Sequence, residues 1–353
     1  MGVNIVPSFA DRPMGMQDGY PDFAKRRRHI ESGLIDFFDK AGYELVSSGA
    51  FEYVETLLRA RPVEAARDWV QLFDGGGNTI ALRPEMTPSI ARMAAPLVSV
   101  GKLPIRWCYA ERVYRRTNDP ASLSWASGKA AESTQVGIEL IGEAGHQSDA
   151  DMLALCHEAA LAIGLSDTQI VVSHARFVPA LLRALGIAED GIPRLLNCLT
   201  SGDYVAFTSL LPLSISIDVL SVLQQLTPFS STGLDGIIPE SAWLDEAARG
   251  EVLHAWQTLR TLAIAVEERG LTDYLTFDLT LHRDITYYTG LVFEMFAPGV
   301  GAPIAQGGRY DDLLEQFGAS APAIGLAFEV ERVMAVLRAA THETDDEGGT
   351  GAC

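Results

Sequence analysis

Residues 277–311, FDLTLHRDITYYTGLVFEMFAPGVGAPIAQGGRYD, decide the fold of this chain. Apolar side chains recur at every second position from Leu291 to Met295, a period that predicts a β-strand. The Gly- and Pro-rich segment 299–303 supplies turn residues before a second strand. Polar side chains surround both strands although packing does not require them, so part of this set is expected to face a cavity: Arg283, Tyr287, Tyr288 and the GGRYD turn at 307–311.

Length and composition indicate a globular protein with a sizeable core. The chain has 353 residues, 48% of them hydrophobic and 21% charged, enough for one large or two ordinary domains. A net charge of −19 argues against a nucleic-acid backbone as the main partner, because phosphate binding relies on Lys and Arg. No signal peptide or membrane-spanning run is recognisable, and the four cysteines lack CxxC spacing, so we expect a cytoplasmic protein without disulfides or zinc.

Outside the opening stretch, the pattern alternates between helical and strand periods. Helices are expected at 21–41 and 149–163, the second with Ser148 and Asp151 in a capping-box-like start. Strands are expected at 105–114 and 133–141, joined by a mobile loop, and the DGGGN turn predicts a hairpin within 70–82.

This order of elements predicts an α+β fold with an antiparallel sheet flanked by helices. A Leu-rich segment with several prolines interrupts the β-rich part of the chain and reads as a helical insertion. A final strand at 322–328 and a helix at 329–340 precede an acidic, Gly-rich tail. The expected organisation is a core of residues 1–175 and 251–340, a helical insertion at 176–250 and a disordered tail at 341–353.

Polar residues inside apolar patterns are the candidates for function, yet each one also has a purely structural explanation. Glu85 would cap the helix that follows it, with Thr87 as an N-cap. Gln135 and Glu139 would face solvent on an exposed sheet surface. Arg283 would lie at the surface, and the tyrosines would be core residues with a hydroxyl partner.

Taken together, these residues belong to six motifs, which are LRPEMT (82–87), VYR (113–115), QVGIELIG (135–142), RDITYYTGLVFE (283–294), GGRYDDLLEQFG (307–318) and AIGLAFEVER (323–332). The set, in this order, resembles the catalytic domain of class II aminoacyl-tRNA synthetases and, within them, histidyl-tRNA synthetases. The resemblance runs from residue 18 to about 337, and the paired YYTG and GGRYD motifs resemble the histidine branch specifically.

The resemblance implies a pocket for free histidine. In it, Glu85, with Thr87 and Gln135, would accept from the ammonium group. Arg115, assisted by Arg283, would hold the carboxylate through charge-assisted hydrogen bonds. Glu139 would accept from one imidazole N–H, and a tyrosine hydroxyl would serve the other nitrogen. The expected histidine-binding residues are Glu85, Thr87, Arg115, Gln135, Glu139, Arg283, Tyr287, Tyr288 and Tyr310.

Several positions depart from the synthetase pattern. Thr117 stands where the family usually has a glutamate, and the loop after it carries Lys129 as its only basic residue. Glu329 replaces a glycine that leaves room for the nucleotide and would bring negative charge near a polyphosphate. Met86 and Thr286 also differ from the usual residues. The chain stops about one helix after Arg332, where the family continues into an anticodon-binding domain.

A histidine pocket without secure ATP chemistry resembles one paralogue group, the regulatory subunits of ATP phosphoribosyltransferase. This resemblance implies a subunit with no catalytic residues, cofactor or metal, which binds L-histidine and is required for the activity and feedback inhibition of the short-form catalytic subunit in the first step of histidine biosynthesis. It also implies a homodimer within a hetero-octamer, with no tRNA and no membrane as partners. Two alternatives remain: a synthetase-like enzyme that forms histidyl-adenylate for a non-tRNA acceptor, and a scaffold that no longer binds histidine.

Overall fold

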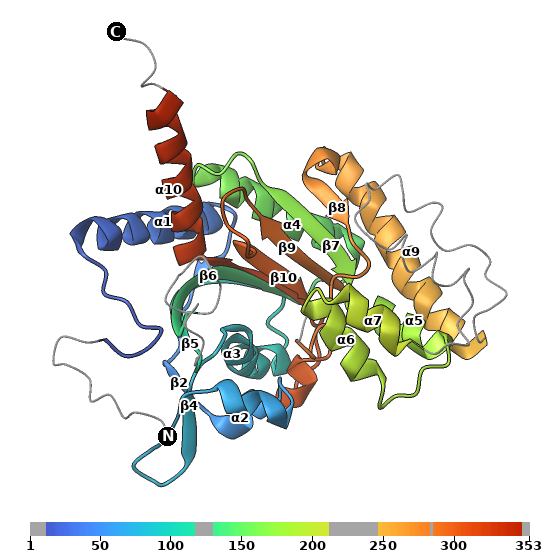
Figure 1. Cartoon of the computed structure of the whole chain (residues 1–353). Helices are drawn as coiled ribbons and strands as arrows, with labels where there is room; N and C mark the ends of the chain where they lie inside the picture. Colours follow the sequence, from blue (N-terminus) through green and yellow to red (C-terminus); the bar gives the residue numbers. More distant parts are fainter. Residues whose placement is uncertain (1–11, 117–129, 212–245, 283–284, 348–353) are drawn as a thin grey trace, which may run out of the picture.

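A mixed eight-stranded sheet forms the centre of the molecule (Figure 1). The computed structural model describes residues 12–116, 130–211, 246–282 and 285–347. In spatial order, the sheet consists of β1 (Glu44–Leu45), β5 (Ile105–Tyr114), β6 (Glu132–Ile141), β11 (Ala323–Glu329), β10 (Ala305–Arg309), β9 (Leu291–Phe296), β7 (Gln169–His174) and β8 (Leu275–Phe277).

The α+β class is confirmed, but the sheet is not purely antiparallel as expected. Its six central strands pair antiparallel, whereas β1 with β5 and β7 with β8 form parallel pairs at the two edges. A parallel pair needs a long crossover connection. The chain from β7 to β8 contains the helical insertion, which provides such a crossover.

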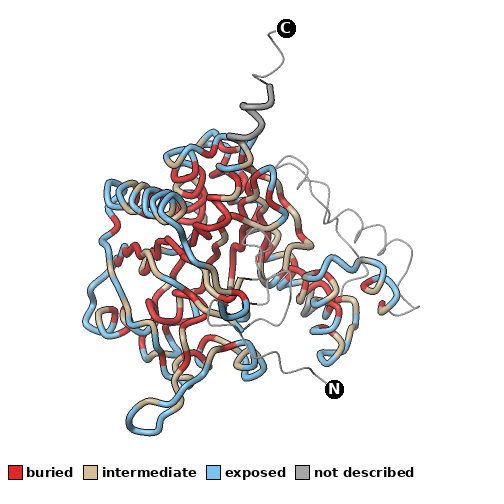
Figure 2. The backbone as a smooth tube through the Cα atoms, turned by 60° about the vertical axis from the view of Figure 1, so that its left-hand side comes forward, coloured by how far each residue is buried: buried red, intermediate tan, exposed pale blue. Residues whose placement is uncertain are grey.

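Helices cover both faces of the sheet, and two large clusters of buried residues lie against it. Figure 2 shows buried segments in the centre of the molecule and exposed segments around them. On one face lie α1 (Pro21–Lys40), α4 (His146–Ala162) and α10 (Val330–Glu347), with α9 (Glu246–Glu268) against α4 and β7. The other face carries α3 (Thr87–Ser99), which contacts the short helix η6 (Leu314–Phe317) and α2 (Val54–Leu58). The candidate functional residues belong to this second face.

Strand alternation determines which side chains reach that face. In β6, Val136, Ile138 and Leu140 enter the larger cluster under α1 and α4. Residues one position along a strand point to the opposite face, so Gln135 and Glu139 lie together on the side of α3. The apolar series predicted for β9 also packs into the larger cluster, through Leu291, Phe293 and Met295.

Helix boundaries required three corrections. The expected capping box at Ser148 is wrong, because α4 begins at His146 with Gly145 as its N-cap and the Ser148 hydroxyl donates to the Gly145 carbonyl. The expected domain boundary at 250 falls inside α9, which is continuous from Glu246. Helix α10 continues to Glu347, into the expected disordered tail, because no Gly or Pro interrupts it before Gly348.

The helical insertion and the hairpin have the expected character. The described part of the insertion contains α5 (Phe177–Ala184), α6 (Ile192–Thr200) and α7 (Tyr204–Leu210), while residues 212–245 lie outside the described part. The predicted hairpin pairs β3 (Gln71–Phe73) with β4 (Thr79–Leu82), and β2 (Phe51–Tyr53) completes a separate three-stranded sheet. No helix in the described ranges is both long and apolar enough to cross a membrane.

Candidate functional site

A cavity of about 690 Å³ opens on the α3 side of the central sheet. Its volume lies within the range of ~300–1,000 Å³ that is typical of small-molecule sites. Of the expected binding residues, seven line it: Glu85, Thr87, Arg115, Gln135, Tyr287, Tyr288 and Tyr310. Residues far apart in the sequence therefore meet at one cavity.

Glu139 lies directly behind the wall of this cavity. Its side chain is 1% exposed and accepts two hydrogen bonds. The Tyr310 hydroxyl donates to Oε2 at 2.5 Å, and the Thr87 hydroxyl donates to Oε1 at 2.9 Å. Thr87 therefore does not act as the N-cap of α3, a position that Met86 occupies.

Burial changes the protonation of Glu139. Loss of water contact raises its pKa to about 7, although the hydrogen bonds from Tyr310 and Thr87 act in the opposite direction. Burial likewise raises the pKa of Tyr310 well above its ordinary value, and the neighbouring Glu139 adds to this effect. The tyrosine is therefore a neutral donor to a carboxyl group that titrates near neutral pH.

Glu85 forms a second polar cluster in the lining of the cavity. The Tyr287 hydroxyl donates to Glu85 Oε2 at 2.6 Å. Arg61, which sequence reasoning missed, places its Nε 2.9 Å from Glu85 Oε1. Tyr287 packs edge-on against Tyr288 and Tyr310, with ring centroids 5.1 Å and 6.0 Å away. The aromatic rings thus form a rigid wall between the two carboxyl groups.

Glu329 lies next to the cavity with a compensated negative charge. Gln135 donates to its Oε1 at 2.8 Å. Burial alone would raise the pKa of Glu329, but the charges of Arg332 and Arg115 and the Gln135 hydrogen bond outweigh burial and lower it. Glu329 is therefore a buried carboxylate, at a position where the synthetase pattern requires a glycine.

Two glycines permit the close packing around these groups. A Cβ at Gly325 in β11 would lie 1.7 Å from Glu139 Oε2, so no other residue fits beside this carboxyl group. A Cβ at Gly308 in β10 would lie 2.8 Å from the Tyr288 ring. Both glycines thus make room for predicted site residues.

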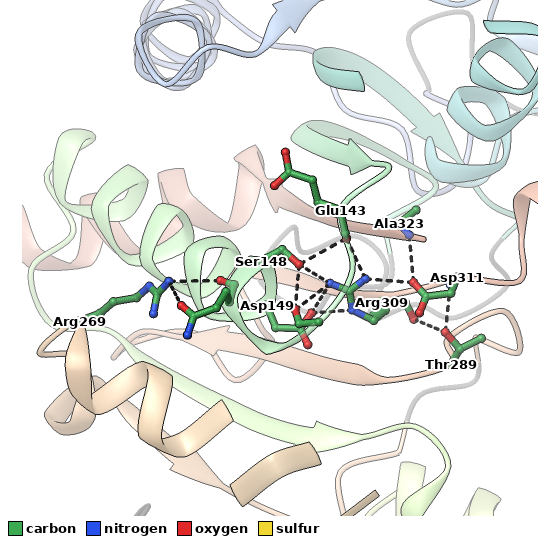
Figure 3. Close-up of polar contacts among 10 residues, drawn as sticks. Glu143, Ser148, Asp149, Arg269, Thr289, Arg309, Asp311 and Ala323 are labelled. Carbon is green, nitrogen blue, oxygen red and sulfur yellow. Dashed lines mark hydrogen bonds and ion pairs between the residues drawn. The ribbon is translucent and has the colours of Figure 1, made fainter. Parts of the chain in front are cut away.

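Arg309, the residue before Tyr310, is the centre of a buried polar network (Figure 3). Arg309 pairs with Asp149 at the start of α4 at 2.6 Å and with Asp311 at 3.0 Å. The Asp311 carboxylate also accepts from the Ala323 N–H of β11 at 3.0 Å. The turn from β10 into η6 is therefore tied to two other elements, and Tyr310 lies between the two anchored residues.

Sequence reasoning did not identify every residue at the cavity. Arg283 and Asp284 lie outside the described residues, so the expected role of Arg283 stays a prediction. Tyr109, Glu294 and Gln306 line the cavity but were not selected. Glu294 offered a signal, because it is a charged residue in an apolar strand and is only 8% exposed. No group of three or more His, Cys, Asp and Glu that could hold a metal occurs in the described ranges.

Comparisons with known proteins place the chain among similar sequences. The family model described as "Histidyl-tRNA synthetase" matches residues 15–333. A curated relative from Desulfitobacterium hafniense (strain Y51), named "ATP phosphoribosyltransferase regulatory subunit", is 33% identical over 91% of this chain and 80% of its own length. A relative with the same name from Halalkalibacterium halodurans is 31% identical over 94% of this chain and 81% of its own.

Two solved structures are also similar to this chain. A structure from Alicyclobacillus acidocaldarius, described as a "Histidine--tRNA ligase subunit", is 56% identical, with a TM-score of 0.84 over 95% of this chain and 99% of that one. Another from Bacillus halodurans, described as an "ATP phosphoribosyltransferase regulatory subunit/histidyl-tRNA synthetase", is 29% identical, with a TM-score of 0.79 over 94% of this chain and 84% of that one. The chain therefore belongs to the family of ATP phosphoribosyltransferase regulatory subunits, which shares the fold of histidyl-tRNA synthetases.

Proposed function

We propose that this protein is a non-catalytic subunit that binds free histidine and, through it, regulates the catalytic subunit of short-form ATP phosphoribosyltransferase. The observation that carries the proposal is the pair of acidic clusters, Glu85 with Tyr287 and Glu139 with Tyr310, at one cavity of small-molecule size. Histidine has two N–H-bearing groups, the ammonium and the imidazole. Both acidic clusters place hydroxyl groups in the lining of one cavity, which suits such a ligand.

The direction of the hydrogen bonds indicates how these clusters would act. A hydroxyl that donates its only proton to a carboxylate can offer a ligand only its lone pairs. Tyr310 and Thr87 donate to Glu139, so both would accept from an imidazole N–H. Glu139 would then act as a positioning residue for both hydroxyls rather than as a direct ligand. Arg115, which lines the cavity, would hold the carboxylate of histidine.

Glu329 supports a role other than adenylate formation. The charges of Arg332 and Arg115 stabilise the buried carboxylate of Glu329, which leaves these two arginines less available to hold a polyphosphate. The alternative, a synthetase-like enzyme that makes histidyl-adenylate for a non-tRNA acceptor, is supported by Arg115 and Arg332 at the cavity and by the name of the relative from Alicyclobacillus acidocaldarius. ATP–pyrophosphate exchange that depends on histidine would favour this alternative and contradict the regulatory proposal.

The proposal places the protein in a complex. Its partners would be the short-form catalytic subunit and a second copy of this chain, within a cytoplasmic hetero-octamer that contains no tRNA. The net charge of −19 favours protein partners over nucleic acid. The helical insertion and the histidine-binding core would be the two units available for contact.

Co-purification with a short-form ATP phosphoribosyltransferase, followed by its activity with and without histidine, tests the proposal. We expect the catalytic subunit to be active only in the complex and histidine to inhibit it. A Glu139→Gln variant should retain the complex and lose most of the inhibition, because Gln cannot accept from both hydroxyls as a carboxylate does. Failure of the two chains to associate, or activity unaffected by histidine, would contradict the proposal.

A further inference from the structure

We propose that Arg61 competes with the ammonium group of the ligand for Glu85 and so sets the affinity and selectivity of the pocket. This inference rests on the proposed function, and it assigns a role to a residue outside the predicted binding set. Its starting point is the ion pair between Arg61 Nε and Glu85 Oε1, 2.9 Å apart at the wall of the cavity.

The two oxygens of Glu85 are in different situations. Oε2 accepts the Tyr287 hydrogen bond at 2.6 Å. Oε1 is buried and accepts no hydrogen bond from the described part of the chain. Arg61 forms an ion pair with Oε1, but the geometry of this contact is not that of a hydrogen bond. A ligand ammonium group, which has three donors free to rotate, could satisfy this oxygen better. It would then replace Arg61 at Glu85.

The Arg61 side chain has a place to go when it is replaced. It lines both this cavity and a second one of about 1460 Å³, which lies against α5 and α6. Glu64 in the lining of the second cavity would attract a guanidinium group, whereas Glu189 and Asp312 there already pair with Arg183 and Arg176. Displacement therefore transfers a positive charge from one cavity to the other.

The backbone around Arg61 is held while its side chain reaches into the cavities. The Arg61 N–H donates to the Leu57 carbonyl at 3.1 Å, and Arg59 Nη1 donates to the Gln316 carbonyl at 2.7 Å. The Arg61 side chain itself is 21% exposed. The exchange would therefore move the Arg61 side chain while its backbone stays bonded to Leu57.

Calorimetric titration with three ligands tests the exchange in the full-length chain. Histidine and histamine carry an ammonium group, whereas imidazolepropionate has only the carboxylate and the ring. For R61Q we expect histidine and histamine to bind about threefold to tenfold more tightly than to wild type, the size expected from removing a partly exposed ion pair. Imidazolepropionate should bind equally to both proteins, because it cannot take the place of Arg61.

Two further variants serve as controls. R61K keeps a competing charge and should stay close to wild type, which would show that R61Q acts through charge. R67Q removes a nearby exposed arginine that lines neither cavity and should leave all three affinities unchanged.

Weaker or unchanged binding of histidine to R61Q would overturn the competition, and weaker binding of both histidine and imidazolepropionate would assign Arg61 to the ligand carboxylate instead. In both cases histidine binding by wild type, and with it the proposed function, would stand. Folded wild type and folded R61Q that both fail to bind histidine would overturn the proposed function together with this inference.

Discussion

At the scale of single residues, the burial of Glu139 links the stability of the fold to pH. Its pKa is raised from 4.5 to about 7 in the folded chain, so the folded state holds this proton more tightly than the unfolded state. Between these pH values the unfolded state binds fewer protons, and the free energy of unfolding must fall as pH rises. Above pH 7 the full penalty for a buried carboxylate is present.

Comparison with Glu139→Gln isolates this contribution, because Gln does not titrate. From pH 4.5 to 8, the free energy of unfolding of wild type should fall relative to the variant by about 3 kcal/mol, the order of magnitude given by the pKa change. Urea unfolding at several pH values measures the difference. Parallel curves for the two proteins would contradict a raised pKa at Glu139.

Gly325 is expected to tolerate no side chain. The Cβ of an alanine would lie 1.7 Å from Glu139 Oε2 and 2.9 Å from the Ile138 carbonyl oxygen. Gly325→Ala should therefore lower the free energy of unfolding by at least about 1–3 kcal/mol, as overpacking does, and should weaken histidine binding. Gly75→Ala, at a turn with no atom within 4 Å of the new Cβ, is the control and should unfold as wild type does.

Single residues also show how far sequence reasoning could reach into the site. Alternation in β6 predicted that Gln135 and Glu139 share a face, because the strand period depends on the local backbone alone. Arg61 could not be found in this way. Its contact with Glu85 joins two loops 24 positions apart, and the path between them passes through a separate three-stranded sheet.

At the scale of elements, long strands and helices were predicted well, and their ends and pairing directions were not. The strands at 105–114 and 133–141 carry a clear period and match β5 and β6 within one residue. The parallel pairing at the two edges depends on which strand the chain returns to after a long connection, and the local sequence pattern does not indicate this. Helix α4 starts three residues before the prediction, because Ser148 and Asp149 bond Gly145 and Arg309 instead of forming a cap.

The ion pair between Arg309 and Asp149 should be one of the strongest links between elements. Its side chains are 7% and 3% exposed, and it joins β10 to α4 (Figure 3). Arg309→Ala leaves Asp149 buried without its counter-charge and should lower the free energy of unfolding by about 3–5 kcal/mol.

Arg176→Ala is the matched control for this comparison. It breaks an ion pair with Asp312 whose side chains are 57% and 63% exposed, which should contribute about 0–1 kcal/mol. Urea unfolding of both variants measures the contrast. Similar losses for the two would contradict the central role of Arg309.

At the scale of the whole molecule, the outer face of the three-stranded sheet exposes apolar and aromatic side chains to solvent. In the three-stranded sheet, Glu52 faces inward and pairs with Arg92, while Phe51 and Tyr53 on the same strand are 51% and 50% exposed. The cross-strand register sets Phe51 opposite Leu82, and Tyr53 opposite Ile80, which pairs with Leu72. The outer face of this sheet is therefore a continuous apolar surface without charge.

A second copy of the chain is the occupant that we expect on this face. Two copies that each carry a net charge of −19 repel one another, and an uncharged apolar face lets them associate with the least repulsion. Light scattering after size-exclusion chromatography should give twice the 38.1 kDa mass of the chain. The Tyr53→Glu variant should be monomeric where wild type is dimeric, because the substitution places a negative charge from each copy in the contact. Val205→Glu, at a residue 82% exposed on α7, should leave the mass unchanged, and a monomeric wild type would contradict this assignment of the face.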